Sequence, residues 1–170
     1  MALFELSFTK TMQNEGGYLL HNVTGDHGGK TFAGIAMAFW PDWRGWALLE
    51  QGNNSIELER AVKEFYKDNF WCKINGDNIK IQQVADTIYD FAVNAGVVVA
   101  VKLAQEIVKE ARDGVIGPAT LRAINLVDPD FFVARYCCGR VGLRAKICNR
   151  DKSQSKFLLG WINRDLGSLG

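Results

Sequence analysis

The chain has 170 residues, of which 48% are hydrophobic and 23% are charged. This length allows one domain with a proper hydrophobic core, and the composition is ordinary for a soluble globular protein. The formal net charge is only +1, so the chain lacks the strong basic field on which nucleic-acid binding relies. We therefore expect no nucleic-acid partner, and any attraction to an anionic polymer has to come from local patches.

The first ten residues, MALFELSFTK, show no basic leader, no apolar run of signal-peptide length and no small-residue cleavage pattern. No stretch approaches the roughly 18 consecutive apolar residues of a membrane-spanning helix. We expect a protein that is cytoplasmic when made and that does not insert stably into a membrane.

The four cysteines form no CxxC pair, and two of them are adjacent in the sequence, which makes a poor disulfide framework. We interpret them as reduced thiols and not as metal ligands. They are Cys72, Cys137, Cys138 and Cys148.

The first predicted element is an amphipathic helix. Phe4, Phe8 and Met12 recur at a spacing of four, and Glu15 continues the same face three residues later. Two glycines then end the helix, which places Glu15 in the last turn. The helix dipole and the nearby apolar side chains both disfavour the ionised form there, so we expect a raised pKa for Glu15. A carboxyl that stays protonated near neutral pH is what a general acid requires.

A glycine-rich segment, EGGYLLHNVTGDHGGKTFAGI, runs from Glu15 to Ile35. Such a density of glycine indicates unusual backbone dihedrals or close approach to a ligand. Asp26 lies in a polar turn of this segment, where its carboxylate should stay ionised. Two carboxylates whose environments separate their pKa values are typical of glycosidic bond hydrolysis. Thr31 follows in a strand-like stretch, where a threonine is commonly only a strand former.

Two other kinds of site were weighed for this segment. His21 and His27 lie near Asp26, but the three residues lack the fixed spacing of zinc sites. The sequence GDHGG also lacks the GK[ST] ending of a phosphate-binding loop. We therefore expect neither a metal ion nor a cofactor.

Beyond Ile35 the pattern is mostly helical. An apolar run ends at Trp40, because Pro41 disfavours helix at the residue before it. The following loop carries Trp43 and Trp46 as well. These aromatic rings either stack against sugar rings or form a packed hinge between two lobes.

The remaining chain predicts a series of helices. One is capped by Ser55 and runs to about Trp71, and a largely apolar one over 81–95 should be the central helix of the fold. Further helices are predicted over 97–111, from Pro118 onward, and over 131–148 and 153–166. Asn94, near the end of the central helix, is a poor helix former. It either reaches the acetamide or hydroxyl groups of a substrate or caps local backbone.

Two groups of motifs carry a resemblance to a known family. EGGY at Glu15–Tyr18, followed by DxGGxTxxGI at Asp26–Ile35, resembles the signature of glycoside hydrolase family 108, bacterial and phage N-acetylmuramidases once described as secretion activator proteins. YDFAVNAG at 89–96, DGVIGPATLRAIN at 113–125 and GWINR at 160–164 resemble the C-terminal half of those enzymes, which carries a predicted peptidoglycan-binding region. The Glu, Asp, Thr series is also similar to the active site of phage-type lysozymes.

The resemblance implies a mainly α, lysozyme-like helical fold in which a small glycine-rich β-turn or hairpin carries the active site. We expect one domain over 1–170, with sub-regions 1–75 as a catalytic lobe and 76–170 as a helical lobe with the peptidoglycan-binding motif. Glu15 would be the acid, while Asp26 and Thr31 would hold the attacking water. The residues expected to contact substrate are Tyr18, which alternatively packs the turn onto the helix, Trp43 and Asn94.

The implied activity is that of a lysozyme, which cleaves the β-1,4 bond between N-acetylmuramic acid and N-acetylglucosamine. We expect inversion, for which the two carboxyl groups lie about 6.5–9.5 Å apart, against about 5–5.5 Å for retention. The partner would be the glycan strands of peptidoglycan, and the protein a monomer that reaches the wall after holin-type or non-classical release. The alternatives are a non-catalytic cell-wall-binding module and a secretion-assisting protein.

Overall fold

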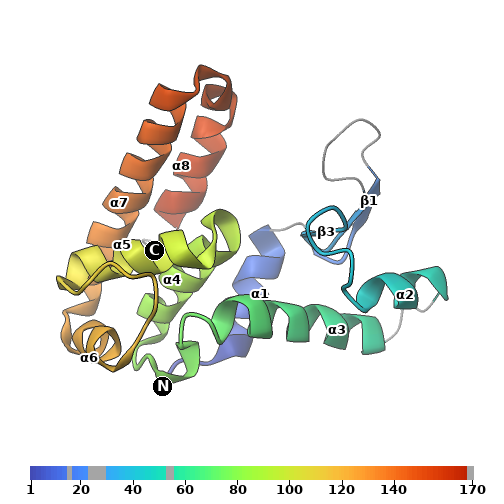
Figure 1. The fold of residues 1–170 in the computed structure, drawn as a ribbon, viewed down its shortest axis with the longest axis horizontal. Helices are drawn as coiled ribbons and strands as arrows, with labels where there is room; N and C mark the ends of the chain where they lie inside the picture. The colour runs from blue at the N-terminus through green and yellow to red at the C-terminus, as the bar shows by residue number, and fades with distance from the viewer. Residues whose placement is uncertain (15–16, 23–29, 53–55, 168–170) are drawn as a thin grey trace. The chain divides into compact units, whose positions relative to one another are not determined.

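The computed structural model describes residues 1–14, 17–22, 30–52 and 56–167 (Figure 1). This part of the chain is mainly α-helical, with one small antiparallel sheet of three strands, as predicted. The α-helices are α1 (Phe4–Asn14), α2 (Gly45–Glu50), α3 (Ile56–Tyr66), α4 (Gln82–Ala95), α5 (Val97–Val108), α6 (Pro118–Leu126), α7 (Pro129–Arg150) and α8 (Leu158–Leu166). The strands are β1 (Leu20–Asn22), β2 (Lys30–Phe32) and β3 (Ile35–Ala36). Short π- and 3-10 segments are η1 (Lys67–Trp71), η2 (Gly76–Asn78) and η3 (Lys152–Phe157).

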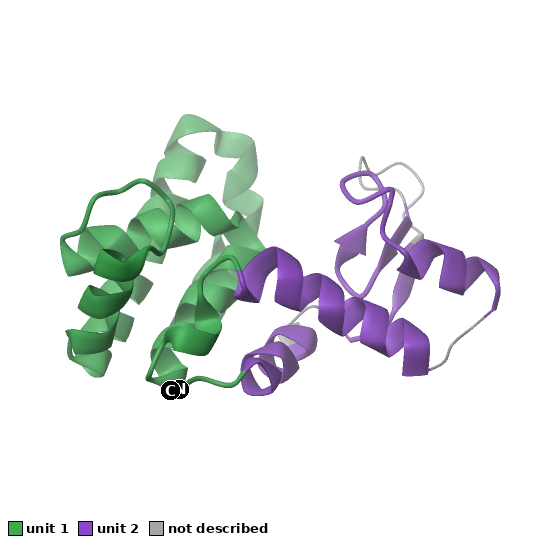
Figure 2. Cartoon of the chain, turned by 60° about the horizontal axis from the view of Figure 1, so that its bottom comes forward, with its two compact units in different colours: residues 1–3, 73–170 green, residues 4–72 purple. Residues whose placement is uncertain are grey.

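The chain divides into two compact units, which are coloured separately in Figure 2. One unit comprises residues 4–72 and contains α1, the sheet, α2 and α3. The other comprises residues 1–3 and 73–170 and contains the helices from α4 onward. The assignment of residues 1–75 as a catalytic lobe stays a prediction.

The apolar face predicted for helix α1 is buried in the structure. Phe4, Phe8 and Met12 are all buried, and the rings of Phe4 and Phe8 lie 5.4 Å apart. After the helix, the Gly17 N–H donates to the carbonyl of Met12 at 2.9 Å. Gly17 has φ +76°, a value that favours glycine. One of the last carbonyl groups of the helix is thereby satisfied.

Helix α3 confirms the predicted helix over residues 56–66 but corrects its end. Five apolar residues of the expected face are buried; they are Leu58, Ala61, Val62, Phe65 and Tyr66. From Lys67 to Trp71 the chain continues as a π-helix, closed by the Cys72 N–H donating to the Lys67 carbonyl at 2.8 Å. The wider turn brings Trp71, five residues after Tyr66, onto the buried face, where it is completely enclosed.

Helix α4 is confirmed as the central helix of its unit. Val84, Ala85, Ile88, Phe91 and Ala92 are almost fully buried, and α4 packs against both α5 and α7. The predicted boundary at its end is also correct, since Gly96 has φ +93° and separates α4 from α5.

Helix α5 is shorter than the predicted helix over 97–111. It ends at Val108 because Lys109 takes a left-handed conformation with φ +59°. The loop that follows is held by the fully buried side chain of Gln105, whose Nε2 donates to Asp113 Oδ1 at 2.7 Å. The Val115 N–H donates to the same oxygen at 2.8 Å. The hydrogen bond from Gln105, followed by that from Val115, lowers the pKa of Asp113.

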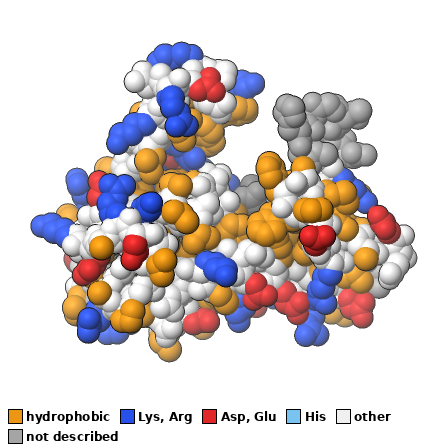
Figure 3. All heavy atoms as spheres, in the orientation of Figure 1, with side chains coloured by type: hydrophobic (Ala, Val, Ile, Leu, Met, Phe, Trp, Pro, Cys, Tyr) orange, Lys and Arg blue, Asp and Glu red, His pale blue; other side chains and the backbone are white. Residues whose placement is uncertain are grey.

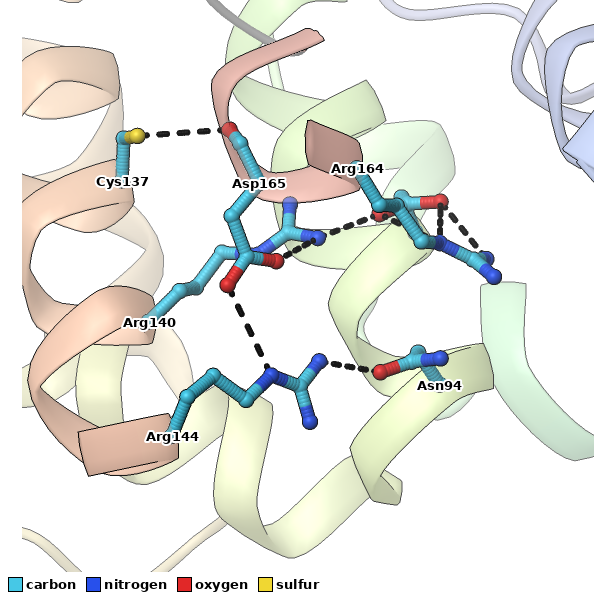
Figure 4. Close-up of polar contacts among 7 residues, drawn as sticks. Asn94, Cys137, Arg140, Arg144, Arg164 and Asp165 are labelled. Atoms are coloured by element: carbon cyan, nitrogen blue, oxygen red, sulfur yellow. Dashed lines mark hydrogen bonds and ion pairs between the residues drawn. The ribbon is translucent and has the colours of Figure 1, made fainter. Parts of the chain in front are cut away.

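A buried network of ion pairs joins α4, α7 and α8 (Figure 4). Arg140 of α7 is completely buried, and its Nη2 lies 2.6 Å from Asp165 Oδ1 and 2.7 Å from Asp90 Oδ2. Asp90 also pairs with Arg164 at 2.9 Å, and Arg144 Nε lies 3.5 Å from Asp165 Oδ2. Charged groups therefore occupy the interior of this helical unit, where α4 meets α7 and α8.

The cysteines agree with the prediction of reduced thiols. None of the four is in a disulfide; Cys72 and Cys138 are exposed, whereas Cys137 and Cys148 are buried. Across the described residues, no helix has both the length and the apolar character needed to cross a membrane.

Candidate active site

The two predicted catalytic carboxylates, Glu15 and Asp26, lie outside the described residues, as does His27. The structure describes the elements on either side of them. Helix α1 ends at Asn14, directly before Glu15. Strand β1 ends directly before residues 23–29, and strand β2 begins directly after them. In the sequence, Asp26 comes between these two paired strands.

Thr31 lies at the centre of the sheet. The strand order is β1-β2-β3, and Thr31 on the middle strand is opposite His21 on one side and Ala36 on the other. The predicted strand is thus confirmed. Successive side chains of a strand point to opposite faces, and the neighbouring Phe32 is buried whereas Thr31 is only half-buried. Thr31 therefore belongs to the sheet face that is not packed into the core, together with the exposed His21.

The turn between β2 and β3 holds Thr31 in place. Ala33 and Gly34 have φ values of +48° and +77°, as required at both central positions of a two-residue type I′ hairpin. A positive φ is unfavourable for alanine. The buried hydroxyl of Tyr66 donates to the Ala33 carbonyl at 2.9 Å and fixes this conformation from α3. The strand that carries Thr31 is therefore anchored at its end by a side chain of a different element.

Phe32 brings two other predicted site residues together. The ring of Tyr18 lies 6.4 Å from that of Phe32, and the ring of Trp43 stacks on Phe32 at 6.2 Å with an interplanar angle of 21°. The structure thus brings Tyr18 and Trp43 together around Phe32, whereas the side chain of Thr31 points to the opposite face of the sheet. Phe32 was not among the predicted site residues. Because side chains alternate between the two faces of a strand, its position next to Thr31 is the signal that places it on the opposite, buried face.

Tyr18 packs against the sheet and keeps an exposed edge, with 39% of its surface accessible. Partial burial, followed by the negative charge of Glu59, raises the pKa of its hydroxyl. Tyr18 therefore stays neutral and can donate a hydrogen bond over the physiological pH range. The ring contact of Tyr18 is with Phe32 of the sheet. Packing of the turn onto the helix and contact with substrate both stay predictions.

Trp40, Trp43 and Trp46, which we call the tryptophan cluster, pack with one another. The rings of Trp43 and Trp46 meet edge to face at 5.0 Å, and Trp46 Nε1 donates to the Trp40 carbonyl at 2.8 Å. Trp46 is buried in α2 and not in the predicted loop, because a short helix begins at Gly45. Gly45 leaves the space that the Trp43 ring occupies; a Cβ there would lie 2.2 Å from Trp43 Cη2.

A pocket of about 480 Å³ opens beside this cluster, within residues 4–72. Trp40, Trp43 and Phe65 supply aromatic rings to its wall, and Asp68 and Asn69 supply polar groups. Aromatic surface combined with a few polar groups is the chemistry that sugar rings require. Trp46 does not line the pocket, so the cluster is in part a packing element and in part a pocket wall.

Asn94 lies in the other unit, in the last turn of α4. Its Oδ1 accepts a hydrogen bond from Arg144 Nη2 (Figure 4). The guanidinium group of Arg144 also lies 5.2 Å from the ring of Phe91 and 4.9 Å from that of Trp161. Neither alternative weighed from the sequence included this arginine, and a contact of Asn94 with substrate stays a prediction.

The sequence does hold a signal for the buried arginines. Phe132, Val133, Tyr136 and Cys137 form the buried stripe of α7. Arg140 and Arg144 continue this stripe at helical spacing. Arginine is almost never fully buried unless it is paired, so its position on an apolar stripe indicates carboxylate partners elsewhere in the chain.

Comparisons with known proteins cover almost the whole chain. The family model of glycosyl hydrolase 108 matches residues 8–96, and that of a predicted peptidoglycan domain matches residues 99–166. Among solved structures, SagA of Brucella abortus is similar, with a TM-score of 0.68 and 25% identity over 98% of this chain and 95% of that one. No curated protein matches the chain. The chain therefore belongs to the glycosyl hydrolase 108 family and carries a predicted peptidoglycan domain after it.

Proposed function

We propose that the chain is a peptidoglycan hydrolase, an N-acetylmuramidase that cleaves the β-1,4 bond between N-acetylmuramic acid and N-acetylglucosamine. The observation that carries the proposal is the family match over residues 8–96, which includes Glu15, Asp26 and Thr31 in one continuous motif. Glu15 protonates the leaving glycosidic oxygen, while Asp26 and Thr31 hold the water that attacks the sugar from the opposite face.

The described elements around these residues support the assignment. Catalytic groups need positions held by rigid elements and by packed neighbours. The helix that leads to Glu15 is anchored by buried Phe4, Phe8 and Met12. Thr31 lies on the middle strand and has a neighbour on each side. A water-holding hydroxyl at this position has a fixed backbone, which is the requirement for placing one water molecule.

The glycan would also contact aromatic rings. Trp43 lines the pocket of about 480 Å³, and Tyr18 keeps an exposed edge beside Phe32. Stacking of a sugar ring on such faces supplies binding without metal or cofactor. We assign these two residues to substrate contact on this basis.

The reaction is expected to proceed with inversion. Proton NMR of a digest in its first minutes distinguishes the two courses, since an inverting enzyme releases the α-anomer from a β-linked glycan. Mass spectrometry of the same digest identifies the bond. Muramic acid at the new reducing ends supports the proposal, whereas glucosamine at those ends or released peptides would contradict it.

The decisive test is Glu15→Gln, which keeps the size of the side chain and removes the acidic proton. We expect it to abolish clearing of a peptidoglycan gel while binding to purified cell wall is retained. Clearing at the wild-type rate would refute the catalytic assignment.

The match over residues 99–166 also favours a second function, that of a non-catalytic wall-binding protein. The two hypotheses separate in the same experiment. A wild-type chain that binds wall tightly and never produces reducing ends would support the second function.

A further inference from the structure

Two hollows on the helical unit meet along the valley between α5 and α7. One has a volume of about 490 Å³ and the other of about 420 Å³. Both are lined by Leu103 and Glu106 of α5 and by Gly139 of α7. The two hollows adjoin at these residues, and we call them together the α5–α7 groove. It lies within the residues matched by the predicted peptidoglycan domain.

Two glycines of α7 line the groove, and their surroundings differ. Gly139 faces Leu103 closely, since a Cβ at that glycine would lie 2.5 Å from Leu103 Cδ1. Gly142 lies one turn further on and borders open space, because no atom lies within 4 Å of the position that an added Cβ would take. The floor is apolar and includes Val99 and Phe131, which are 41% and 52% exposed.

The rim of the groove is strongly basic. Among the described residues that line it, the positive side chains are Lys102, Lys109, Arg112, Arg135 and Lys146. The negative charge on the lining comes from Glu106, which already pairs with Arg112 at 3.0 Å. Figure 3 shows many Lys and Arg side chains over α5 and α7. On a chain whose net charge is only +1, this is a local patch that attracts carboxylates.

The dimensions suit a short extended peptide. The groove follows α5 from Val99 to Ile107, and eight residues of α-helix rise by about 12 Å. A fully extended peptide of four residues spans at most about 14 Å. Of the lining side chains, only that of Phe131 is aromatic, whereas sugar rings prefer aromatic faces. Apolar floor and cationic rim together fit a peptide with small apolar side chains and several carboxylates.

We propose that the α5–α7 groove binds the peptide stem of peptidoglycan, an acidic tetrapeptide that contains alanine. The rim cations pair with the stem carboxylates, and the alanine methyl groups lie on the apolar floor. The inference rests on the peptidoglycan assignment of the proposed function, but it does not depend on the chain's being catalytic. An experiment can therefore refute hydrolysis by residues 4–72 without refuting stem binding by this groove, and the reverse also holds.

The test uses the full chain and the free tetrapeptide L-Ala-D-isoGlu-meso-diaminopimelyl-D-Ala, with the lysine-containing tetrapeptide as a second probe, in isothermal titration calorimetry. Arg135→Glu combined with Lys146→Glu reverses a charge at each end of the groove. We expect the dissociation constant to rise about tenfold or more, because two attractive contacts become repulsive. The matched control is Arg122→Glu combined with Lys156→Glu, which reverses two exposed cations outside the groove lining and should change the constant less than twofold.

Three further measurements keep the proposal falsifiable. Circular dichroism must show equal folding of both double variants, and the milder Arg135→Gln with Lys146→Gln should give an intermediate loss. Binding of chitotetraose, which has no peptide, should be the same in all variants. The proposal is overturned if neither tetrapeptide binds the wild type, if both double variants weaken binding equally, or if phosphatidylglycerol vesicles and not tetrapeptides respond to the groove charges. An inactive Glu15→Gln chain that still binds the tetrapeptide would leave this inference standing.

Discussion

Removal of the charge of Asp165 should destabilise the helical unit strongly. Asp165→Asn keeps the shape of the side chain and one oxygen acceptor, so the charge is the main change. In the native chain the Asp165 carboxylate is completely buried and lies 2.6 Å from Arg140 and 3.5 Å from Arg144. Burial, opposed by the charge of Asp165, lowers the pKa of Arg144, which shows that this guanidinium is already partly desolvated.

The magnitude follows from what the substitution leaves behind. Arg140 would keep Asp90, 2.7 Å away, but Asp90 also serves Arg164 at 2.9 Å. Asp90 would then remain as the carboxylate beside Arg140 and Arg164, and Arg144 would lose the carboxylate 3.5 Å from its Nε. Breaking a buried ion pair by removing one partner costs about 3–5 kcal/mol. For a chain of this size, each kcal/mol lowers the melting temperature by about 2–4 °C, so the expected decrease is about 6–20 °C.

The assay is urea unfolding followed by far-ultraviolet circular dichroism, with the melting temperature from a thermal scan. Glu106→Gln is the matched control, because it makes the same carboxylate-to-amide change in an exposed ion pair, 3.0 Å from Arg112, of the same unit. An exposed pair contributes about 0–1 kcal/mol. The urea midpoint should therefore fall far more for Asp165→Asn than for Glu106→Gln, with little change in the slope of the transition.

A double replacement tests the reason for the loss. Arg140→Met combined with Asp165→Leu removes both charges and restores apolar volume, so it should recover part of the lost stability. Equal, small losses for Asp165→Asn and Glu106→Gln would refute the reasoning. The reasoning would also be refuted if the double variant were less stable than Asp165→Asn by as much as the loss of a second buried charge costs.

Three further predictions concern the site, the loop after α5 and the tryptophan cluster. Thr31→Val should lower the rate of glycan hydrolysis by about 10- to 100-fold through a misplaced water, whereas Thr31→Ser should retain most activity; equal rates would contradict the water-holding role. The pKa of Asp113 is lowered in the folded protein, chiefly by the hydrogen bond from Gln105. This shift stabilises the folded state above the carboxyl's unfolded pKa of about 4, and the stabilisation disappears as the pH falls through the lower folded pKa. The urea midpoint of Asp113→Asn should therefore lie below that of the wild type at pH 6 and approach it at about pH 2. Gly45→Ala should lower the free energy of unfolding by about 1–3 kcal/mol, because it displaces an indole ring of the tryptophan cluster. Gly160→Ala should raise it by about 0.5–1 kcal/mol, because nothing lies within 4 Å of the added methyl group. Changes of the same sign for both variants in urea unfolding would contradict the packing argument.

The helices of this protein could be predicted largely from the sequence because their signal is local. The spacing of Phe4, Phe8 and Met12 predicted α1, and five apolar residues of α3 proved to be the buried ones. Gly96 and Pro118 marked helix boundaries through backbone preferences that neighbours do not alter. The family signature around Glu15 and Asp26 was likewise a contiguous stretch that needed no coordinates.

Local patterns failed where a side-chain hydrogen bond or packing against another helix decides the conformation. The end of α5 came three residues early because Gln105 holds the loop around Asp113. Helix α3 passes into a π turn that buries Trp71, whose ring lies 5.8 Å from that of Phe4 in another helix. Periodicity along one helix contains no information about such partners.

By itself, the sequence determined the helical content, the buried face of α1, α3 and α4, and membership in a glycosidase family, since each depends on residues a few positions apart. Only the tertiary structure decided that Arg140 of α7 meets Asp165 of α8 and Asp90 of α4, and that α5 and α7 enclose a basic groove. These features arise from helices that pack against one another. Their charges interact across space, and both the distance between them and their burial set how strongly.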